Sequence, residues 1–219
     1  MKIPFNHIQE KLQKDPFFEL RTLGKNTIRE HTLPVHRYGE APSCFRFFDW
    51  TEEDDSETIQ YAFHTTEIGK LLIANTSKGI CFLGFAREDE ATLLEDFASR
   101  FPKHTLKEER SHFQQLAADY CNGPNEGSIP LHLKGTPFQL GIWRQLVRIP
   151  AGQLSTYGSL SDDPGAAQAV GSAVGANPVS YIIPCHRIVK SDGNIQGYHW
   201  GMEVKKQLLA YELQQEVER

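Results

Sequence analysis

A cysteine and a histidine stand side by side within the stretch Asn177–Val189. The thiolate is the reactive form of cysteine, and a cationic neighbour lowers the pKa of the thiol from its usual value of about 8.5. The apolar run Tyr181–Ile183 predicts a short buried strand, which Pro184 ends because it has no N–H to donate. Cys185 is therefore expected at the end of a rigid segment, where its side chain has a fixed direction.

The pair Cys185–His186 has two interpretations when taken alone. Successive side chains of an extended backbone point to opposite faces, so a water bridge between the two is more plausible than a direct hydrogen bond. The other interpretation is a buried structural cysteine followed by an unrelated surface histidine, because the spatial partner of a cysteine need not be its sequence neighbour. The residues on either side of the pair are needed to choose between them.

Longer matches on both sides of the pair favour the catalytic interpretation. The hexapeptide Pro184–Val189 resembles the active-site signature of the O6-alkylguanine-DNA alkyltransferases, which move an alkyl group from guanine onto their own cysteine. Asn177 lies eight residues before the cysteine, as in that family, and Gly197–Gly201 matches the segment after it. The resemblance is close over residues 131–212, looser over 61–102 and absent over 1–57.

A glutamate on the apolar side of the last expected helix, residues 202–216, is a candidate partner for the histidine. Val204, Leu208 and Glu212 follow at four-residue spacing, which places them on one stripe of a helix. A carboxylate on an apolar face must find a partner or shift its pKa, unless the side chain extends to water near the helix end. His186 would satisfy Glu212, and the family has a glutamate at this distance, 27 residues after the cysteine.

The resemblance implies a mechanism in which the target nucleotide is rotated out of the duplex, because its alkyl carbon cannot be reached inside it. Glu212 would orient His186, which would take the proton of Cys185 through a water. The sulfur would attack the alkyl carbon in one displacement, and Tyr157 would donate a proton to the leaving oxygen. Asn177 would brace the turn before the cysteine. The thioether product is stable, so each molecule would act once and without a cofactor.

The resemblance also assigns the residues that contact substrate and DNA. The helix expected over residues 166–176 is mostly Ala, Gly and Ser, which allows close approach to another helix or, as in the family, to the minor groove. The family often has an arginine 17 residues before the cysteine; this chain has Gln168 there, which predicts weaker DNA affinity with base flipping retained. The implied substrate pocket is formed by Ile188, Gly197, Tyr198 and His199, although Tyr198 could equally be a packing residue. The implied DNA contacts are Gln168, Ala169, Gly171, Ser172 and Arg187.

Composition indicates a globular protein. The 219 residues are 39% hydrophobic and 11% aromatic, so one domain or two small ones can bury a core. No run approaches the roughly 20 apolar residues of a spanning helix, and the N-terminus lacks the apolar core of a signal peptide, which predicts a cytoplasmic or nucleoid-associated protein. The four cysteines contain no C-x-x-C pair, so free thiols are expected and no metal site is indicated.

The net charge of −5 does not by itself indicate a nucleic-acid-binding protein. The acidity lies mainly in the first part of the chain, because residues 131–219 carry eight Lys and Arg against seven Asp and Glu. A weakly charged second part can dock on DNA with few phosphate contacts and a shallow salt dependence. Charge alone therefore does not identify the partner. The resemblance implies that the partner is double-stranded DNA with alkylated guanine, and the protein is expected to be a monomer.

Hydrophobic patterns predict a small sheet with helices in the first half of the chain. Ser77–Gly79 has the composition of a tight turn and would join two of the strands as a hairpin. Amphipathic stripes predict helices around residues 93–101 and 113–120. The expected strands are residues 59–63, 71–74, 80–85 and 129–133.

The second half reads as mainly helical. Thr136 and Pro137 are typical of a helix start, and Trp143 in that helix is expected to pack in the core. Two short helices across a tight turn within residues 157–176 predict a helix-turn-helix. The predicted fold is therefore mixed α/β (α+β), with a ribonuclease-H-like sheet subdomain and a winged-helix-like helix-turn-helix domain, as the family has them.

Three parts of the chain are expected from these patterns. The acidic run 51–57 is typical of a solvated linker and marks the first boundary. The parts are an N-terminal extension of unknown role (1–57), a companion subdomain (58–130) and a DNA-binding alkyltransferase domain (131–219).

Two other functions are considered beside direct repair of O6-alkylguanine and O4-alkylthymine. An alkyltransferase-like sensor would bind the lesion without transfer, but that class lacks the nucleophile that Cys185 supplies. A thiol hydrolase would need an oxyanion hole, for which the sequence has no motif.

Overall fold

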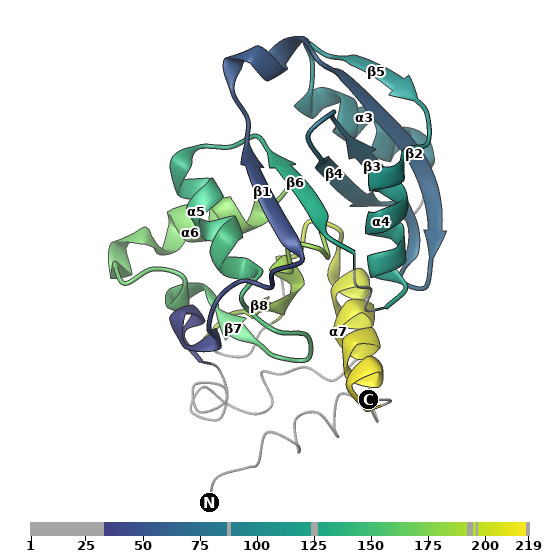
Figure 1. Cartoon of the computed structure of the whole chain (residues 1–219). Coiled ribbons are helices and arrows are strands. Elements are labelled where there is room, and N and C mark those ends of the chain that lie inside the picture. The colour runs from purple at the N-terminus through teal and green to yellow at the C-terminus, as the bar shows by residue number, and fades with distance from the viewer. Residues whose placement is uncertain (1–32, 87–88, 124–126, 192–194, 196, 218–219) are drawn as a thin grey trace, which may run out of the picture. The chain divides into compact units, whose positions relative to one another are not determined.

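Two compact units make up the described part of the chain (Figure 1). The sheet unit comprises residues 42–140 and 178–182, and the helical unit comprises residues up to 41, 141–177 and from 183 onward. The three-part division expected from the sequence remains a prediction, and most of the N-terminal extension lies outside the described residues. The computed structural model describes residues 33–86, 89–123, 127–191, 195 and 197–217.

A six-stranded sheet with the order β1-β6-β4-β3-β2-β5 forms the sheet unit. β3 runs antiparallel to both of its neighbours, and the other strand pairs are parallel. Every residue of β4 and β6 is buried, as expected for strands covered on both faces. The four expected strands are present, and the sequence did not indicate β1 or β5. The strands are β1 (Phe45–Asp49), β2 (Thr58–Thr66), β3 (Gly69–Asn75), β4 (Ile80–Phe85), β5 (Thr105–Glu108) and β6 (Ile129–Leu133).

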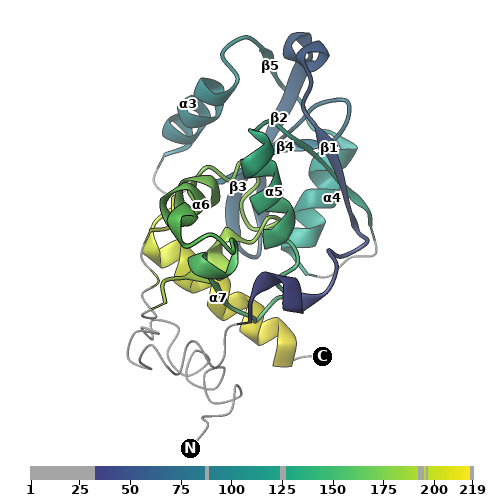
Figure 2. The same ribbon diagram turned by 90° about the vertical axis from the view of Figure 1, so that its left-hand side faces the viewer.

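Helices α3 (Glu90–Arg100) and α4 (His112–Cys121) cover opposite faces of this sheet (Figures 1 and 2). Asp89 caps α3 by accepting two backbone N–H groups of the first turn, and Ser111 caps α4 in the same way with one. Phe97 of α3 is fully buried and its ring packs 5.1 Å from that of Phe82 in β4. Both helices agree with the stripes in the sequence. The mixed α/β class is therefore confirmed.

The turn between β3 and β4 requires a glycine at position 79. Gly79 has a φ of +154°, and a Cβ there would lie 2.5 Å from the carbonyl oxygen of Pro130, too close for any side chain. The N–H of Thr76 donates to the carbonyl of Gly79 at 2.9 Å and closes the turn. The hairpin expected around residues 77–79 is therefore confirmed.

Helices and two short strands form the helical unit, and α5 (Pro137–Leu146) begins in the last residues of the sheet unit and continues into the helical unit. α5 starts as expected, since the Thr136 hydroxyl and the Gln139 side chain accept each other's backbone N–H. Trp143 is buried and donates from Nε1 to the carbonyl of Ala173 at 2.8 Å, which supports its packing role, whereas Phe138 is 44% exposed and lies outside the core. None of the helices that the structure describes has the length and apolar character needed to cross a bilayer. The elements are α5 (Pro137–Leu146), β7 (Ser155–Thr156), α6 (Ala167–Gly175), β8 (Ile188–Val189) and α7 (Met202–Val217), with β7 and β8 parallel.

The run Tyr181–Ile183 does not form the strand that its composition predicted. Tyr181 has a φ of 70°, a left-handed conformation that is rare for a bulky residue. The N–H of Ile182 donates back to the carbonyl of Ser180 at 3.0 Å, which closes a three-residue turn. Val179 instead makes a single parallel bridge to β4. An apolar run shows that a segment is buried, but it does not distinguish a strand from a buried turn.

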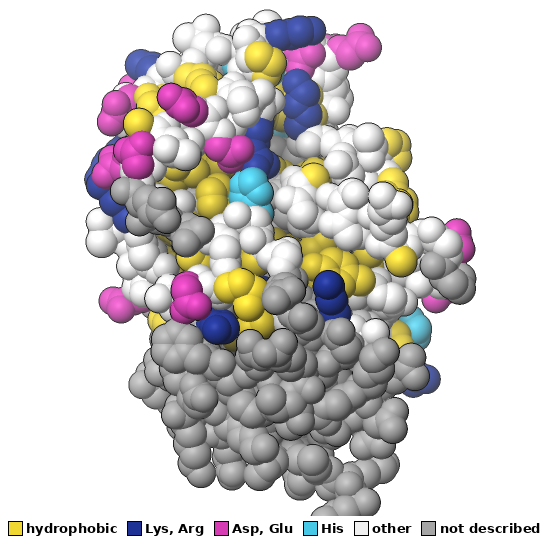
Figure 3. Space-filling view, turned by 180° about the vertical axis from the view of Figure 1, so that it is seen from behind, with side chains coloured by type: hydrophobic (Ala, Val, Ile, Leu, Met, Phe, Trp, Pro, Cys, Tyr) yellow, Lys and Arg dark blue, Asp and Glu magenta, His cyan; other side chains and the backbone are white. Residues whose placement is uncertain are grey.

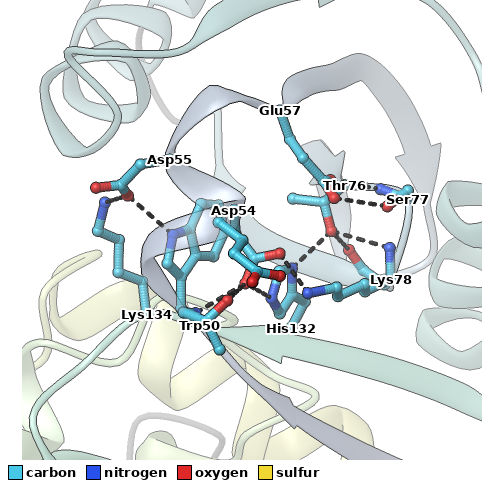
Figure 4. A network of polar contacts seen from close by, with 12 residues as sticks. Trp50, Asp54, Asp55, Glu57, Thr76, Ser77, Lys78, His132 and Lys134 are labelled. Carbon is cyan, nitrogen blue, oxygen red and sulfur yellow. Dashed lines mark hydrogen bonds and ion pairs between the residues drawn. The ribbon is translucent and has the colours of Figure 1, made fainter.

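The acidic run around Asp54 is not the solvated linker that its composition indicated. It forms the 3-10 helix Glu52–Ser56, and Asp54 is 1% exposed. The Asp54 carboxylate accepts the N–H and hydroxyl of Thr51, both at 2.8 Å, and pairs with the ammonium of Lys78 (Figure 4). Nε2 of His132 lies 3.3 Å from the same carboxylate. A buried charge with several partners joins this segment to the sheet.

His132 of β6 is the centre of the same network. Its fully buried ring is stacked on Trp50 with ring centroids 4.5 Å apart, and its Nδ1 lies 2.7 Å from the Thr76 hydroxyl (Figure 4). Burial lowers the pKa of His132 and Asp54 opposes that effect, so the ring is neutral near pH 7. The network therefore ties β6, the β3–β4 turn and the segment after β1 to one another.

We expect Asp54→Asn to lower the free energy of unfolding by about 2 kcal/mol, the typical effect of losing hydrogen bonds to a charged group. Burial raises the pKa of Asp54, but Lys78 and Thr51 lower it more, so the net pKa is below its usual value. The stabilisation is therefore present above the unfolded-state pKa near 4 and is lost as the pH falls. Urea denaturation at pH 7 and pH 3 measures both effects.

The exposed neighbour Glu53 provides the matched control. Glu53→Gln should change the stability by less than about 0.5 kcal/mol at either pH. Equal losses in the two variants would show that the burial of Asp54 has no special effect.

Candidate active site

Cys185 begins a single 3-10 turn, Cys185–Arg187, in the helical unit. Pro184 before it has φ −83° and ψ 63°, and the N–H of Cys185 donates to the carbonyl of Ile183 at 2.8 Å, so a second three-residue turn precedes the cysteine. The N–H of Ile188 closes the 3-10 turn on the carbonyl of Cys185. Consecutive turns, rather than the end of a strand as expected, therefore set the direction of the sulfur.

Asn177, which lies two residues after the end of α6, contacts this turn. Its Nδ2 donates to the carbonyl of Ile183 at 2.7 Å and to Sγ of Cys185 at 3.0 Å. Both side chains are buried, with 5% of Asn177 and 7% of Cys185 exposed. The sequence predicted that Asn177 braces the turn. The structure adds a direct hydrogen bond to the sulfur, which favours the thiolate.

Glu212 of α7 receives the two side chains that follow the cysteine. Nε2 of His186 lies 2.6 Å from Oε1 of Glu212. Arg187 donates from Nε to both carboxylate oxygens at 3.1 Å and from Nη2 to Oε1 at 2.7 Å. The N–H of Gly152 donates to Oε2 at 3.3 Å. The carboxylate is 2% exposed, so these contacts replace the water it loses on burial.

Arg187 has a different environment from the one that the sequence predicted. It was expected to contact DNA, but it is 7% exposed and its Nη1 donates to the carbonyl of Ile149. This burial argues against the DNA contact and makes Arg187 the charge that compensates Glu212. A buried carboxylate that faces only a neutral histidine would lack a counter-charge. The need for a cation near Glu212 was the one feature of the sequence that could have predicted its ion pair with Arg187.

The electrostatics of the site follow from burial. Burial raises the pKa of the Cys185 thiol, while Asn177 and the nearby ammonium of Lys205 lower it, so the free protein does not have the low thiol pKa that the neighbouring histidine suggested. Burial lowers the pKa of His186, so the imidazole is neutral and can accept a proton. Burial acts to raise the pKa of Glu212, but Arg187 and His186 bring it down to about 2.

Three of the remaining predicted residues lie near the cysteine turn. Tyr157 begins a 3-10 turn, Tyr157–Ser159, and burial together with the charge of Cys185 raises the pKa of its hydroxyl. A Cβ on Gly197 would lie 4.0 Å from that hydroxyl, and the φ of 88° at this position favours glycine. The Tyr198 hydroxyl lowers the pKa of the Cys185 thiol, against the larger effect of burial, which raises it.

The two other predicted pocket residues differ in exposure. Ile188 is fully buried in β8, whereas His199 is exposed and its ring packs edge-on against Trp200 at 4.6 Å. Among the described residues, no group of three or more His, Cys, Asp or Glu side chains is arranged to hold a metal ion.

α6 presents small uncharged residues to solvent. Gln168, Ala169 and Ser172 are exposed and Gly171 is half-exposed, whereas Val170 is buried against the unit. In the space-filling view, charged side chains gather over the sheet unit, and the part of the face formed by α6 is almost free of them (Figure 3). A helix surface of this kind lets a partner approach the backbone closely.

Known proteins resemble this chain over the same region. A family model described as "6-O-methylguanine DNA methyltransferase, DNA binding domain" matches residues 137–214. The chain is 36% identical over 165 residues to the bifunctional transcriptional activator/DNA repair enzyme Ada of Escherichia coli K12, covering 72% of this chain and 46% of Ada, so it spans about half the length of that relative. It is 34% identical to the inducible methylated-DNA–protein-cysteine methyltransferase of Bacillus subtilis 168, covering 73% of this chain and 93% of that protein. The crystal structure of Mycobacterium tuberculosis OGT in complex with DNA has a TM-score of 0.55 at 30% identity, covering 72% of this chain and 94% of that one.

We expect Glu212→Gln to lower the free energy of unfolding by about 3 kcal/mol, because it leaves the buried guanidinium of Arg187 without a counter-charge. The folded-state pKa of about 2 lies below the unfolded value near 4.3, so the stabilisation is present above about pH 5 and is lost as the pH falls towards 2. Chemical denaturation between pH 3 and 7 measures this effect. Glu203→Gln, at an exposed position of the same helix, should leave stability nearly unchanged, and a similar loss there would contradict the assignment.

Proposed function

The chain belongs to the methylated-DNA–protein-cysteine methyltransferase family, and from that membership we propose that it repairs DNA by transferring the alkyl group of O6-alkylguanine to Cys185. The observation that supports this most directly is the arrangement on one turn of the chain. The Cys185 sulfur accepts a hydrogen bond from Asn177, and the next residue, His186, is a neutral imidazole held by a buried carboxylate. A nucleophile and a base oriented by a third group are the requirements of nucleophilic catalysis.

Ionisation of the sulfur is the first chemical step. In our proposal, His186 accepts the Cys185 proton through a bridging water, and the Glu212 carboxylate stabilises the imidazolium that forms. Arg187 holds Glu212 in its charged form, because their ion pair keeps the pKa of the carboxyl low. The base is therefore ready to accept a proton at neutral pH although it is fully buried.

The transfer step then follows in one displacement. A bond forms between the sulfur and the alkyl carbon while the bond from that carbon to O6 of guanine breaks. In this proposal Tyr157 protonates the leaving oxygen, and its raised pKa keeps the hydroxyl protonated until that moment. The product is a thioether and unmodified guanine, so each molecule acts once and no cofactor takes part.

The DNA is proposed to bind through α6. Its exposed, uncharged surface suits the minor groove, where base identity is read only weakly, as a repair protein that acts in any sequence requires. Gln168 would fill the space that the flipped nucleotide leaves, and Ala169, Gly171 and Ser172 would approach the groove. The M. tuberculosis protein of similar structure has been crystallised with DNA, which supports this partner class.

The flipped base is proposed to enter a pocket formed by Tyr198, Gly197, His199 and the backbone at Ile188. Alkylated guanine is the expected substrate and O4-alkylthymine a second one. We further propose that the protein acts inside the cell as a monomer, because the substrate is chromosomal DNA and one cysteine completes one repair.

Intact mass after incubation with a duplex containing O6-methylguanine tests the proposal. We expect one added methylene per molecule, located on Cys185, and none on Cys185→Ala. Cys44→Ala is the control, because Cys44 is a free thiol in the sheet unit and should not affect transfer. Binding without a gain in mass would indicate a lesion sensor, and multiple turnovers would indicate a hydrolase; either result would overturn the proposal.

Gln168→Arg tests the assignment of α6. An arginine at this exposed position adds a charge and a stacking surface, so we expect duplex affinity to rise by about tenfold at low salt. Gln115→Arg makes the same charge change at an exposed position of α4 and should have a much smaller effect. Fluorescence anisotropy with a labelled duplex measures both, and unchanged affinity in Gln168→Arg would remove this residue from the DNA contact.

A further inference from the structure

We propose that Lys205 is a positioning residue for the transfer reaction, with its buried ammonium on α7 acting as the counter-charge that favours the anionic form of the Cys185 sulfur. Nothing in the sequence indicated this role, because a lysine in a helix rich in charged residues is usually solvated. The inference rests on the proposed function in one respect, namely that Cys185 is the nucleophile.

Burial of the ammonium is the first observation. Lys205 is 1% exposed, and its Nζ donates to the carbonyl of Ile188 at 2.6 Å. A buried ammonium is costly unless an opposite charge compensates it. Within the described part of the chain no carboxylate forms an ion pair with Lys205, whereas the next residue, Lys206, lies 3.6 Å from Glu203. A single carbonyl does not neutralise a full charge, so another anionic group is needed.

The backbone connects Lys205 to the cysteine turn. The carbonyl of Ile188 accepts the ammonium, and the N–H of the same residue donates to the carbonyl of Cys185. The ammonium is therefore held on the residue that closes the turn carrying the sulfur. The charge of Lys205 lowers the pKa of the Cys185 thiol, and Cys185 raises the pKa of Lys205, while burial brings the pKa of Lys205 down to about 8.

The two buried charges of α7 have different counter-charges, and they act in opposite directions on His186, whose pKa Glu212 raises and Lys205 lowers. Lys205 and Glu212 are seven residues apart, about two helical turns or roughly 10 Å along the axis, and both are buried. Glu212 is already compensated by Arg187, with which it forms an ion pair at 2.7 Å. With the sulfur ionised, Lys205–Cys185 forms a second compensated pair beside Arg187–Glu212, and the proton taken up by His186 faces the Glu212 carboxylate. With the sulfur protonated, the charge of Lys205 is left without compensation.

This charge balance opposes the effect of burial on the thiol. Alkyl transfer removes the charge compensation of Lys205, because the thiolate becomes a neutral thioether and the ammonium loses its counter-charge. The coupling between two sites is reciprocal, so Lys205 should release its proton more readily once Cys185 is alkylated. The same residue thus assists ionisation before transfer and changes its protonation afterwards.

The test measures the reaction of Cys185 with iodoacetamide as a function of pH in the full chain. Lys205→Met and Lys205→Arg are compared in a Cys44→Ala background, which removes the one cysteine of the described chain that is partly exposed. We expect the midpoint of the pH profile to rise by about one unit in Lys205→Met, so that the rate below the midpoint falls roughly tenfold. Lys205→Arg should restore most of the loss, and Lys206→Met should match the parent. A folded Lys205→Met variant with the parent's pH midpoint would overturn the proposal.

A second measurement uses the parent chain and does not depend on a variant that folds. NMR of 15N-labelled lysine side chains follows the titration of the Lys205 ammonium before and after alkylation of Cys185 by iodoacetamide. The titration midpoint should shift to lower pH after alkylation, and an unchanged midpoint would refute the coupling. Neither experiment contains DNA, so a failure of methyl transfer from O6-methylguanine would count against the proposed function alone.

Discussion

The carboxylate of Glu212 is the contact on which the arrangement of the site depends. It is removed from water and accepts hydrogen bonds from His186, Arg187 and the backbone of Gly152. Losing any one of these partners leaves part of a buried charge uncompensated, so α7, the cysteine turn and the loop after α5 are held in one arrangement. The precise direction of the Cys185 sulfur is therefore a consequence of an ion pair that does not include it.

Local backbone strain makes a second contribution. Tyr181 has a left-handed conformation, and a tight turn at Pro184 follows three residues later. Such conformations are costly and persist only where the surroundings hold them. Asn177 supplies part of that support by binding both the carbonyl of Ile183 and the sulfur. The short connection between α6 and the nucleophile is thus determined by hydrogen bonds rather than by a strand.

The sheet unit also contains a buried carboxylate that is held by several partners, but among the described residues it has no nucleophile beside it. Asp54 and His132 are buried and bound to Lys78, Thr51 and Thr76, and they join segments that are far apart in the sequence (Figure 4). Both units therefore rely on a buried carboxylate beside a neutral histidine. In the sheet unit the network stabilises a scaffold, and in the helical unit it also supplies a base next to a thiol.

The sequence by itself determined the strands 80–85 and 129–133, the start of α5 at Thr136, the cysteine and its family signature, and the position of Glu212 on an apolar stripe. These features depend on local periodicity, on turn chemistry or on a long contiguous motif. The turn at Tyr181, the burial of Asp54, the ion pair of Arg187 and the buried ammonium of Lys205 were decided only by the tertiary structure. The physical reason is that a charged side chain has the same local sequence pattern whether it faces water or a buried partner, and its partner is brought to it by elements distant along the chain.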